Sequence, residues 1–262
     1  LQKGIKWLAW PVCQIYRACL TLGYIPKVWR IARVVFVPKP GKPDYSIAKA
    51  FRPISLTSFL LKGMERLVDR YLREGPLGTH PLHDNQHAFQ PGKSTETALS
   101  WITARIETAL NNKQYALVVF FDIEGAFDHV RSKDVVRAFH DHGVDGSVIK
   151  WISELLTNRE IQAELLDIKV RRTPGKGMPQ GGGLSPLLWL MVADRLLKIL
   201  NEEGTPAQFF ADDGTIALVG SVLSTLCELM QSALSRVEHW CRQLGLSVNP
   251  AKTEMVLFTR RR

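Results

Sequence analysis

Two apolar runs that carry aspartate at one end constrain this chain more than any other feature. ALVVFFDI spans Ala116–Ile123, and the runs QFF and TIALVG flank Ala211–Gly214. Short runs rich in β-branched and aromatic residues are typical of buried strands. We predict a strand ending near Asp122 and a hairpin that reverses at Asp212 and Asp213, because aspartate tolerates the backbone of tight turns. If these strands are neighbours in one sheet, the three carboxylates converge at one edge.

The rest of the pattern predicts a mixed α and β chain. Further strands are expected at Arg33–Pro38 and Met255–Phe258, and helices at Leu60–Leu72, Thr95–Leu110, Lys133–His142, Ser147–Leu156 and Val222–Leu244. Gly245 is expected to end the last helix, and Ser185 followed by Pro186 is typical of a helix start. The segments Phe51–Thr57 and Asn85–Thr95 are interpreted as polar turns.

Three converging carboxylates repel one another unless a cation compensates them. Carboxylates without histidine or cysteine partners favour a hard ion such as Mg²⁺ or Mn²⁺. Two such ions about 3.5–4 Å apart would stabilise the attacking and leaving oxygens of a phosphoryl transfer. The acids therefore indicate phosphoryl transfer but do not distinguish a polymerase from a nuclease. A plain aspartate-rich turn remains the alternative for the Asp212–Asp213 pair.

The chain is basic, with 34 lysines and arginines against 25 acidic residues, and the excess is uneven. Up to residue 52 the only acid is Asp44. The basic residues of this segment are Lys3, Lys6, Arg17, Lys27, Arg30, Arg33, Lys39, Lys42, Lys49 and Arg52. Such a segment is typical of a surface that contacts a polyanion, although a solvated basic surface is the plainer alternative. Arg260, Arg261 and Arg262 are either a further phosphate contact or a linker.

The sequence shows no sign of a membrane span or of secretion. No apolar run approaches the ~18–20 residues of a spanning helix, and the first residues lack the features of a signal peptide. The chain begins with Leu1 rather than methionine, so we expect a fragment. Four cysteines without zinc spacing, Cys13, Cys19, Cys227 and Cys241, predict buried free thiols in a reducing compartment.

Polar and glycine-rich segments surround the acid-bearing runs. In chain order the motifs are VPKPGK (Val37–Lys42), FRPISL (Phe51–Leu56), NQHAFQPGKST (Asn85–Thr95), FFDIEGAFD (Phe120–Asp128), GMPQGGGLSP (Gly177–Pro186), FADD (Phe210–Asp213) and GLSVNPAKTE (Gly245–Glu254). This series resembles the successive motifs of reverse transcriptases from non-long-terminal-repeat (LINE-like) retrotransposons, those of insect elements most. The resemblance extends over nearly the whole chain from about Trp29 onward.

The resemblance implies an α+β right-hand polymerase fold, with fingers and a palm whose antiparallel sheet is backed by helices on its far face, and without a thumb. We expect residues 1–115 to form the N-terminal region and fingers, and residues 116–130 to form the first part of the palm. Residues 131–175 would be an insertion between fingers and palm, and residues 176–262 the rest of the palm.

The resemblance also implies roles for individual residues. Asp122 and Asp212 would bind two Mg²⁺ ions, for which Mn²⁺ could substitute, with the Ile123 carbonyl as a further ligand and Asp213 completing the cluster. Phe127 would be the aromatic gate that excludes a ribose 2′-hydroxyl, with an ordinary core phenylalanine as the alternative. The remaining candidates for contact with nucleotide, primer or template are Lys39, Arg52, Gln180, Gly181, Phe210 and Ala211. Lys252 would protonate pyrophosphate, although an exposed lysine beside a strand is the plainer alternative.

Three positions depart from the family's usual residues. Phe210 replaces a common tyrosine, Gly183 replaces a common valine and Gly214 replaces larger residues.

The implied partners are an RNA template, a DNA primer or target DNA, and deoxynucleoside triphosphates, with no membrane. An upstream endonuclease and a downstream thumb would adjoin the domain in the whole protein, which would be intracellular and would enter the nucleus during integration. The rival functions are a catalytically dead nucleic-acid-binding relic of the same fold and a two-metal nuclease.

Overall fold

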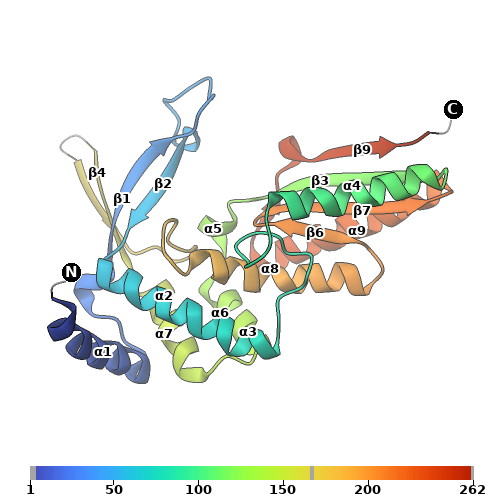
Figure 1. Ribbon diagram of the computed structural model, residues 1–262. Helices are drawn as coiled ribbons and strands as arrows, with labels where there is room; N and C mark the ends of the chain where they lie inside the picture. Colours follow the sequence, from blue (N-terminus) through green and yellow to red (C-terminus); the bar gives the residue numbers. More distant parts are fainter. Residues whose placement is uncertain (1–3, 166–167, 261–262) are drawn as a thin grey trace. The chain divides into compact units, whose positions relative to one another are not determined.

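The computed structural model describes residues 4–165 and 168–260, so Lys3, Arg261 and Arg262 lie outside the described residues. The chain divides into two compact units, and each is built from two separate stretches of sequence (Figure 1). The first unit comprises Leu1–His80 and Arg131–Ser185, and the second comprises Pro81–Val130 and Pro186–Arg262. Each unit contains its own sheet. The assignment of residue ranges to fingers and palm stays a prediction.

The sheet of the first unit has the strand order β2-β1-β4-β5. Its strands are β1 (Ile31–Pro38), β2 (Phe51–Leu56), β4 (Glu160–Leu165) and β5 (Ile168–Arg172). β1 runs antiparallel to β2 and parallel to β4, and β4 and β5 are antiparallel. The interpretation of Phe51–Thr57 as a polar turn is therefore wrong. Pro53 is tolerated in β2 because that strand lies at the edge of the sheet, where a missing N–H costs no ladder hydrogen bond.

The helices of the first unit pack through apolar faces that include Met64, Leu72, Phe139 and Trp151. They are α1 (Ile5–Leu22), α2 (Phe59–Glu74), the short α3 (Pro76–Thr79), α6 (Ser132–Asp141) and α7 (Gly146–Thr157), with 3₁₀ turns at Lys27–Trp29 and Ala48–Ala50. The predictions of α2, α6 and α7 are confirmed to within about two residues. α1, β4 and β5 were not predicted, because α1 buries little of its apolar surface and every residue of β5 is exposed.

The sheet of the second unit is antiparallel and is centred on β3 (Tyr115–Glu124). On one side β3 pairs with β7 (Asp213–Gly220), which pairs in turn with β6 (Ala207–Phe210). On its other side β3 pairs with β8 (Ser247–Val248) and β9 (Glu254–Phe258) at different positions along its length. The prediction that the two acid-bearing elements are neighbours in one sheet is confirmed.

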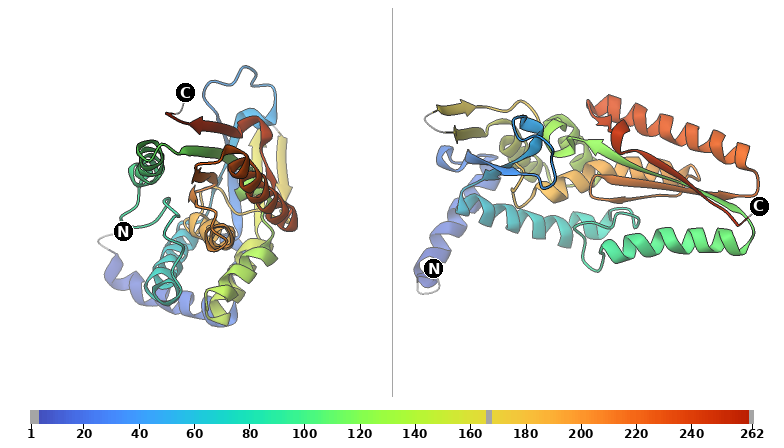
Figure 2. Two further views of the ribbon diagram at one scale, coloured as in Figure 1. Left: turned by 90° about the vertical axis from the view of Figure 1, so that its right-hand side faces the viewer. Right: turned by 90° about the horizontal axis from the view of Figure 1, so that it is seen from above.

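Helices cover both faces of this second sheet. The helices of this unit are α4 (Thr95–Asn111), the short α5 (Ala126–His129), which follows the end of β3, α8 (Ser185–Glu202) and α9 (Leu223–Leu244). Figure 2 shows α4 and α9 on opposite sides of the strands. Besides the helices expected behind the sheet, α4 lies beside the strand faces that carry the acids. The predicted helices are confirmed, and Gly245, with φ +71°, ends α9.

The cysteines differ in exposure. Cys19 and Cys241 are buried as expected, and burial raises the pKa of Cys241 to about 12. Cys13 and Cys227 are exposed, so the expectation of four buried thiols is wrong for these two. They occupy the solvent-facing sides of α1 and α9, a position that cysteine content alone does not reveal. Within the described ranges, no helix has both the length and the apolar character needed to cross a membrane.

Candidate active site

The three predicted acids of the second unit meet at one end of the β3–β7 ladder. Asp122 lies directly opposite Asp213 in the register of these strands. Asp212 lies in the two-residue loop between β6 and β7, and its backbone carbonyl accepts a hydrogen bond from the Ile123 N–H at 3.4 Å. Asp122 is only 9 % exposed, whereas Asp213 is exposed. The register of one antiparallel pair therefore brings the acids together.

Burial and mutual repulsion raise the pKa values of two of these acids. Burial is the largest cause for Asp212, and the charges of Asp213 and Asp122 raise its pKa further. Burial also raises the pKa of Asp213, and the charge of Asp122 adds to the effect. The charge of Lys252 opposes both shifts but does not cancel them. The site thus holds more negative charge than its own side chains neutralise.

Lys252 lies in the turn between β8 and β9, the two strands that pair with the same side of β3. β9 pairs with β3 from Ala116 to Phe120, and β8 pairs with it again at Ile123 and Glu124. The chain between β8 and β9 forms a 3₁₀ turn at Pro250–Lys252, beside the gap. From there the Lys252 Nζ donates to Asp122 Oδ2 at 2.8 Å, a hydrogen bond that raises the lysine pKa.

The donor set suits a hard cation, but its side chains are not arranged as a finished metal site. Over residues 4–165 and 168–260, no three acidic, histidine or cysteine side chains are gathered so that they could hold a metal ion. The Asp122 carboxylate is paired with Lys252 instead. Ile123 is fully buried in β3 opposite Val248. Oxygen ligands of this kind are those that Mg²⁺ and Mn²⁺ prefer.

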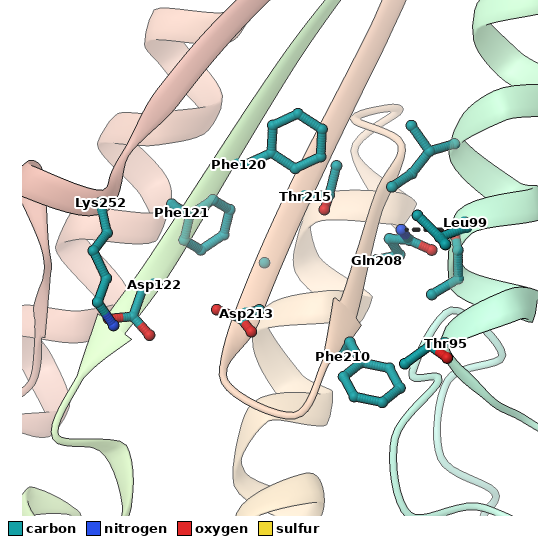
Figure 3. Close-up of a pocket in the computed structure, with 13 residues that line it drawn as sticks. Thr95, Leu99, Phe120, Phe121, Asp122, Gln208, Phe210, Asp213, Thr215 and Lys252 are labelled. Atoms are coloured by element: carbon teal, nitrogen blue, oxygen red, sulfur yellow. Dashed lines mark hydrogen bonds and ion pairs between the residues drawn. The ribbon is translucent and has the colours of Figure 1, made fainter. Parts of the chain in front are cut away.

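A groove of about 460 Å³ adjoins the acids (Figure 3). Thr95 and Leu99 of α4 form one wall, and Phe120 and Phe210 contribute aromatic rings. Asp122, Asp213 and Lys252 are also among its lining residues. A largely apolar groove with a few charged groups at one place is typical of a ligand-binding site, and here those groups are Asp122, Asp213 and Lys252.

Gly214 has a packing reason for its lack of a side chain. It lies opposite Phe121 in the register, and the Phe121 and Phe209 rings meet edge to face with centroids 5.8 Å apart. A Cβ atom on Gly214 would lie 2.2 Å from Phe121 Cζ and 2.6 Å from Phe209 Cε1. This departure from the family pattern is therefore explained by the aromatic pair that packs against Gly214.

Phe127 lies on α5, just after the acid-bearing strand. Gly125, with φ +62°, turns the chain from β3 into this helix. The Phe127 side chain is half-buried, and its ring lies 6.3 Å from the ring of Trp189, centroid to centroid. A half-buried ring that packs against Trp189 is compatible with the gate interpretation, which stays a prediction.

In the first unit, Lys39 and Arg52 lie at the same end of the β1–β2 pair. Arg52 lies opposite Val37, and the Lys39 N–H donates to the Ala50 carbonyl at 2.8 Å just beyond the strands. The Lys39 Nζ donates to the Lys49 carbonyl at 3.0 Å. Arg52 is exposed and Lys39 is half-buried. These two cations therefore share one tip of the hairpin.

The glycine-rich loop that carries Gln180 lies against β2. The Gln180 carbonyl accepts a hydrogen bond from the Ser55 N–H at 2.7 Å. Gly181 has φ +103°, and a Cβ atom there would lie 3.1 Å from the Ser55 carbonyl oxygen. Glycine is therefore required both by the backbone conformation and by the close approach to the strand.

Two buried charged residues that were not predicted as site residues bind the ends of this loop. Glu65 of α2 accepts from the Gly183 N–H at 3.1 Å; burial raises its pKa, and hydrogen bonds from Gly183 and Leu184 lower it. The Arg159 guanidinium donates to the carbonyls of Leu156 and Lys176, and burial lowers its pKa to about 10. For Glu65 a signal existed, because an acid stands within the apolar stripe of α2.

The predicted site residues thus fall into two groups. The second unit contains Asp122, Ile123, Phe127, Phe210, Ala211, Asp212, Asp213 and Lys252, and the first unit contains Lys39, Arg52, Gln180 and Gly181. Register and hydrogen bonds link Asp122, Asp213, Asp212 and Lys252 in the second unit, whereas Lys39 and Arg52 lie at one end of the β1–β2 pair and Gln180 and Gly181 lie beside Ser55.

Residues 37–261 match the family described as "Reverse transcriptase (RNA-dependent DNA polymerase)". The chain belongs to this family. Among its curated relatives, the probable RNA-directed DNA polymerase from transposon BS of Drosophila melanogaster is 30% identical over 259 residues, which cover 94% of this chain and 28% of that protein. The Pol polyprotein from the type-1 retrotransposable element R1 of Bradysia coprophila is 28% identical, over 93% of this chain and 24% of that protein. The resemblance to reverse transcriptases of insect non-long-terminal-repeat retrotransposons is therefore confirmed.

The reverse transcriptase chain spans about a quarter of the length of these curated relatives. Among solved structures, apo telomerase from Candida tropicalis truncated from its C-terminal domain is similar with a TM-score of 0.62 and 13% identity, over 89% of this chain and 51% of that one. At this identity the likeness concerns the fold alone. It confirms the expected right-hand polymerase fold with an antiparallel sheet.

Proposed function

We propose that this chain is the catalytic core of an RNA-directed DNA polymerase, which adds deoxynucleotides to a primer 3′-hydroxyl on an RNA template. The observation that carries the proposal is the register that sets Asp122 opposite Asp213, with Asp212 in the adjoining turn. Membership of the reverse transcriptase family supports the choice of a polymerase over other phosphoryl transferases.

Asp122, Asp212 and Asp213 would hold two Mg²⁺ ions, with Mn²⁺ as a substitute and the Ile123 carbonyl as a further ligand. When bound, these ions would activate the primer hydroxyl and neutralise charge on the transferred phosphoryl group. The raised pKa values of Asp212 and Asp213 support this assignment, because a divalent cation relieves the repulsion that raises them. Asp122 would have to release Lys252 when it becomes a ligand.

Lys252 is proposed to remain beside the reaction after this release. Its ammonium group would then be available to donate a proton to the leaving pyrophosphate, since its Nζ starts within 2.8 Å of an acid of the site. Phe127 would press on the ribose 2′ position, and Phe210 and Ala211 would contact the primer end. In the first unit, Gln180 and Gly181 would border the new base pair, and Lys39 and Arg52 would contact the triphosphate.

Primer extension tests the proposal. The chain is incubated with a labelled DNA primer on an RNA template, Mg²⁺ and the four deoxynucleoside triphosphates, and the primer length is measured. We expect extension that requires the divalent cation. Retention of primer–template without extension would instead favour a binding-only protein, and shortening of the primer would favour a nuclease. Substitution of Asp122 or Asp212 by asparagine should abolish extension, and Asp141→Asn, which changes an exposed carboxylate at the end of α6, is the matched control.

A further inference from the structure

The loop that carries Asp212 contains a residue in an unfavourable backbone conformation. Ala211 has φ +60°, in the left-handed region that side chains disfavour. It occupies the first position of the two-residue loop between β6 and β7, where glycine is the usual choice. Such a conformation persists only when surrounding contacts enforce it.

Gln86 holds the peptide group before the Ala211 Cα. The segment around Gln86 pairs with β6, because the Phe209 N–H donates to the Asn85 carbonyl at 2.9 Å and the His87 N–H donates to the Phe209 carbonyl at 2.8 Å. This pairing buries Gln86 to 1 % exposure. Its Oε1 accepts a hydrogen bond from the Ala211 N–H at 3.3 Å.

Trp189 holds the peptide group after the Ala211 Cα. Its side chain is fully buried in α8, and its Nε1–H donates to the Ala211 carbonyl at 3.0 Å. The two torsions of Ala211 lie between these two peptide groups. Because each group is fixed by a different buried side chain, both torsions are set, and with them the direction in which Asp212 leaves the loop.

We propose that Gln86 and Trp189 are positioning residues that together hold the Ala211 loop in its left-handed conformation and so aim the Asp212 carboxylate. The inference rests on the proposed polymerase function for its kinetic consequences, but not for its structural ones. Trp189 has a second contact, since its ring lies beside Phe127. Its N–H therefore serves the acid-bearing loop, while its ring supports the candidate sugar gate.

The experiment separates these two contacts. Trp189→Phe removes the N–H and keeps a ring, Trp189→Leu removes both, and Gln86→Met removes the acceptor at similar volume. For Trp189→Phe and Gln86→Met we expect kcat for deoxynucleotides to fall by about tenfold, the effect of one lost hydrogen bond on the aim of a catalytic group. The ratio of deoxynucleotide to ribonucleotide kcat/KM should stay unchanged in both variants. In Trp189→Leu, which also loses the ring beside Phe127, both kcat for deoxynucleotides and the ratio of deoxynucleotide to ribonucleotide kcat/KM should fall.

Ala211→Gly provides a suppressor, because glycine adopts positive φ without a side-chain cost. Because Ala211 is itself proposed to contact the primer end, kcat of the Ala211→Gly single variant is the reference. Introduced into Trp189→Phe or Gln86→Met, Ala211→Gly should bring kcat to within about threefold of that reference. If either double variant is no more active than its single parent, the proposed role of these residues in enforcing the loop conformation is overturned.

Trp151→Phe is the matched control, because Trp151 is also fully buried and its Nε1 has no hydrogen-bond partner within the described residues. Amide hydrogen exchange of residues 207–214 supplies a readout that does not depend on activity. Exchange should accelerate in Trp189→Phe and Gln86→Met and stay at the wild-type rate in Trp151→Phe. Unchanged exchange in the first two variants overturns the inference even if the chain is an active polymerase. Faster exchange in a chain that extends no primer supports the inference and counts against the proposed function alone.

Discussion

Asp122 and Asp213 face each other across the β3–β7 ladder, and Lys252 pairs with Asp122 at 2.8 Å. The compensation of the acids is therefore uneven. Asp122 has a direct cationic partner, whereas Asp212 and Asp213 keep raised pKa values despite the charge of Lys252. This asymmetry sets what neutral substitutions should do to catalysis and to stability.

Asp122→Asn and Asp212→Asn should each reduce nucleotide addition to below about 1% of the wild-type rate. Metal ligation supplies several kcal/mol of transition-state stabilisation, and each 1.4 kcal/mol is worth about tenfold in rate. The measurement is single-turnover primer extension, with circular dichroism to show that the fold is retained. Extension above a few per cent in either variant would falsify the assignment of that acid.

Without divalent cations, the stability of the chain should fall as pH rises past the ordinary aspartate range. Asp212 and Asp213 have higher pKa values folded than unfolded, so between the two values the folded state binds more protons and the free energy of unfolding falls with pH. At neutral pH, Asp213→Asn should therefore melt higher than wild type, by roughly 2–4 °C for each kcal/mol of relieved repulsion. Melting curves in chelator at pH 4.5 and 7.5 check this. If the difference in melting temperature between Asp213→Asn and wild type is no larger at pH 7.5 than at pH 4.5, the predicted direction of the pH dependence is wrong.

Phe127→Val should increase ribonucleotide incorporation. A hydroxyl pressed against an aromatic ring loses its water without gaining an acceptor, at a cost of roughly 1–3 kcal/mol. The expected result is a fall of about tenfold or more in the ratio of kcat/KM for deoxy- and ribonucleotides, with a smaller loss for deoxynucleotides. Phe139→Val, in the buried core of the first unit, is the control for a general packing defect. An unaltered ratio in an active Phe127→Val variant would mean that Phe127 is an ordinary core residue and not the gate.

Binding to primer–template should weaken steeply with salt and depend little on sequence, because basic residues contact phosphates rather than bases. Log affinity falls as log salt rises, and removing an exposed cation such as Lys42 should reduce the magnitude of this negative slope by about one. Arg30 is the control: its guanidinium pairs with Glu154 at 2.8 Å and stacks on Tyr24, so Arg30→Gln should lower stability and leave the slope unchanged. A wild-type slope near zero excludes this role for the basic segment.

Gly214→Ala should destabilise the fold by about 1–3 kcal/mol, because the added methyl group overlaps the Phe121 and Phe209 rings. Gly146→Ala is the matched control, since a Cβ atom there meets nothing within 4 Å. Urea unfolding of both variants measures the difference. Equal stability of the two would mean that the aromatic pair moves aside at no cost.

The strands that carry the acids could be predicted because each is a continuous apolar run with aspartate at one end. The same rule failed for β2, where Arg52 and Pro53 stand in an edge strand that tolerates both, and for β5, which is exposed along its whole length. Chain reversal predicted that Asp212 and Asp213 are adjacent in a turn, but the proximity of Asp122 depended on the pairing of β3 with β7, which the sequence offered only as a condition. The roles of Gln86, Glu65 and Trp189 were not, because each depends on a contact with a backbone group distant in sequence.

The two stretches of the first unit are separated by residues 81–130, which belong to the second. On the ribosome, β1 and β2 emerge long before β4, so the parallel edge of β1 stays unpaired while more than a hundred further residues are synthesised. Neither unit can be completed before the chain has crossed into the other and returned. A stop codon near residue 130 would therefore leave both sheets unfinished, because β4 and β5 of the first unit and β6 to β9 of the second would be missing.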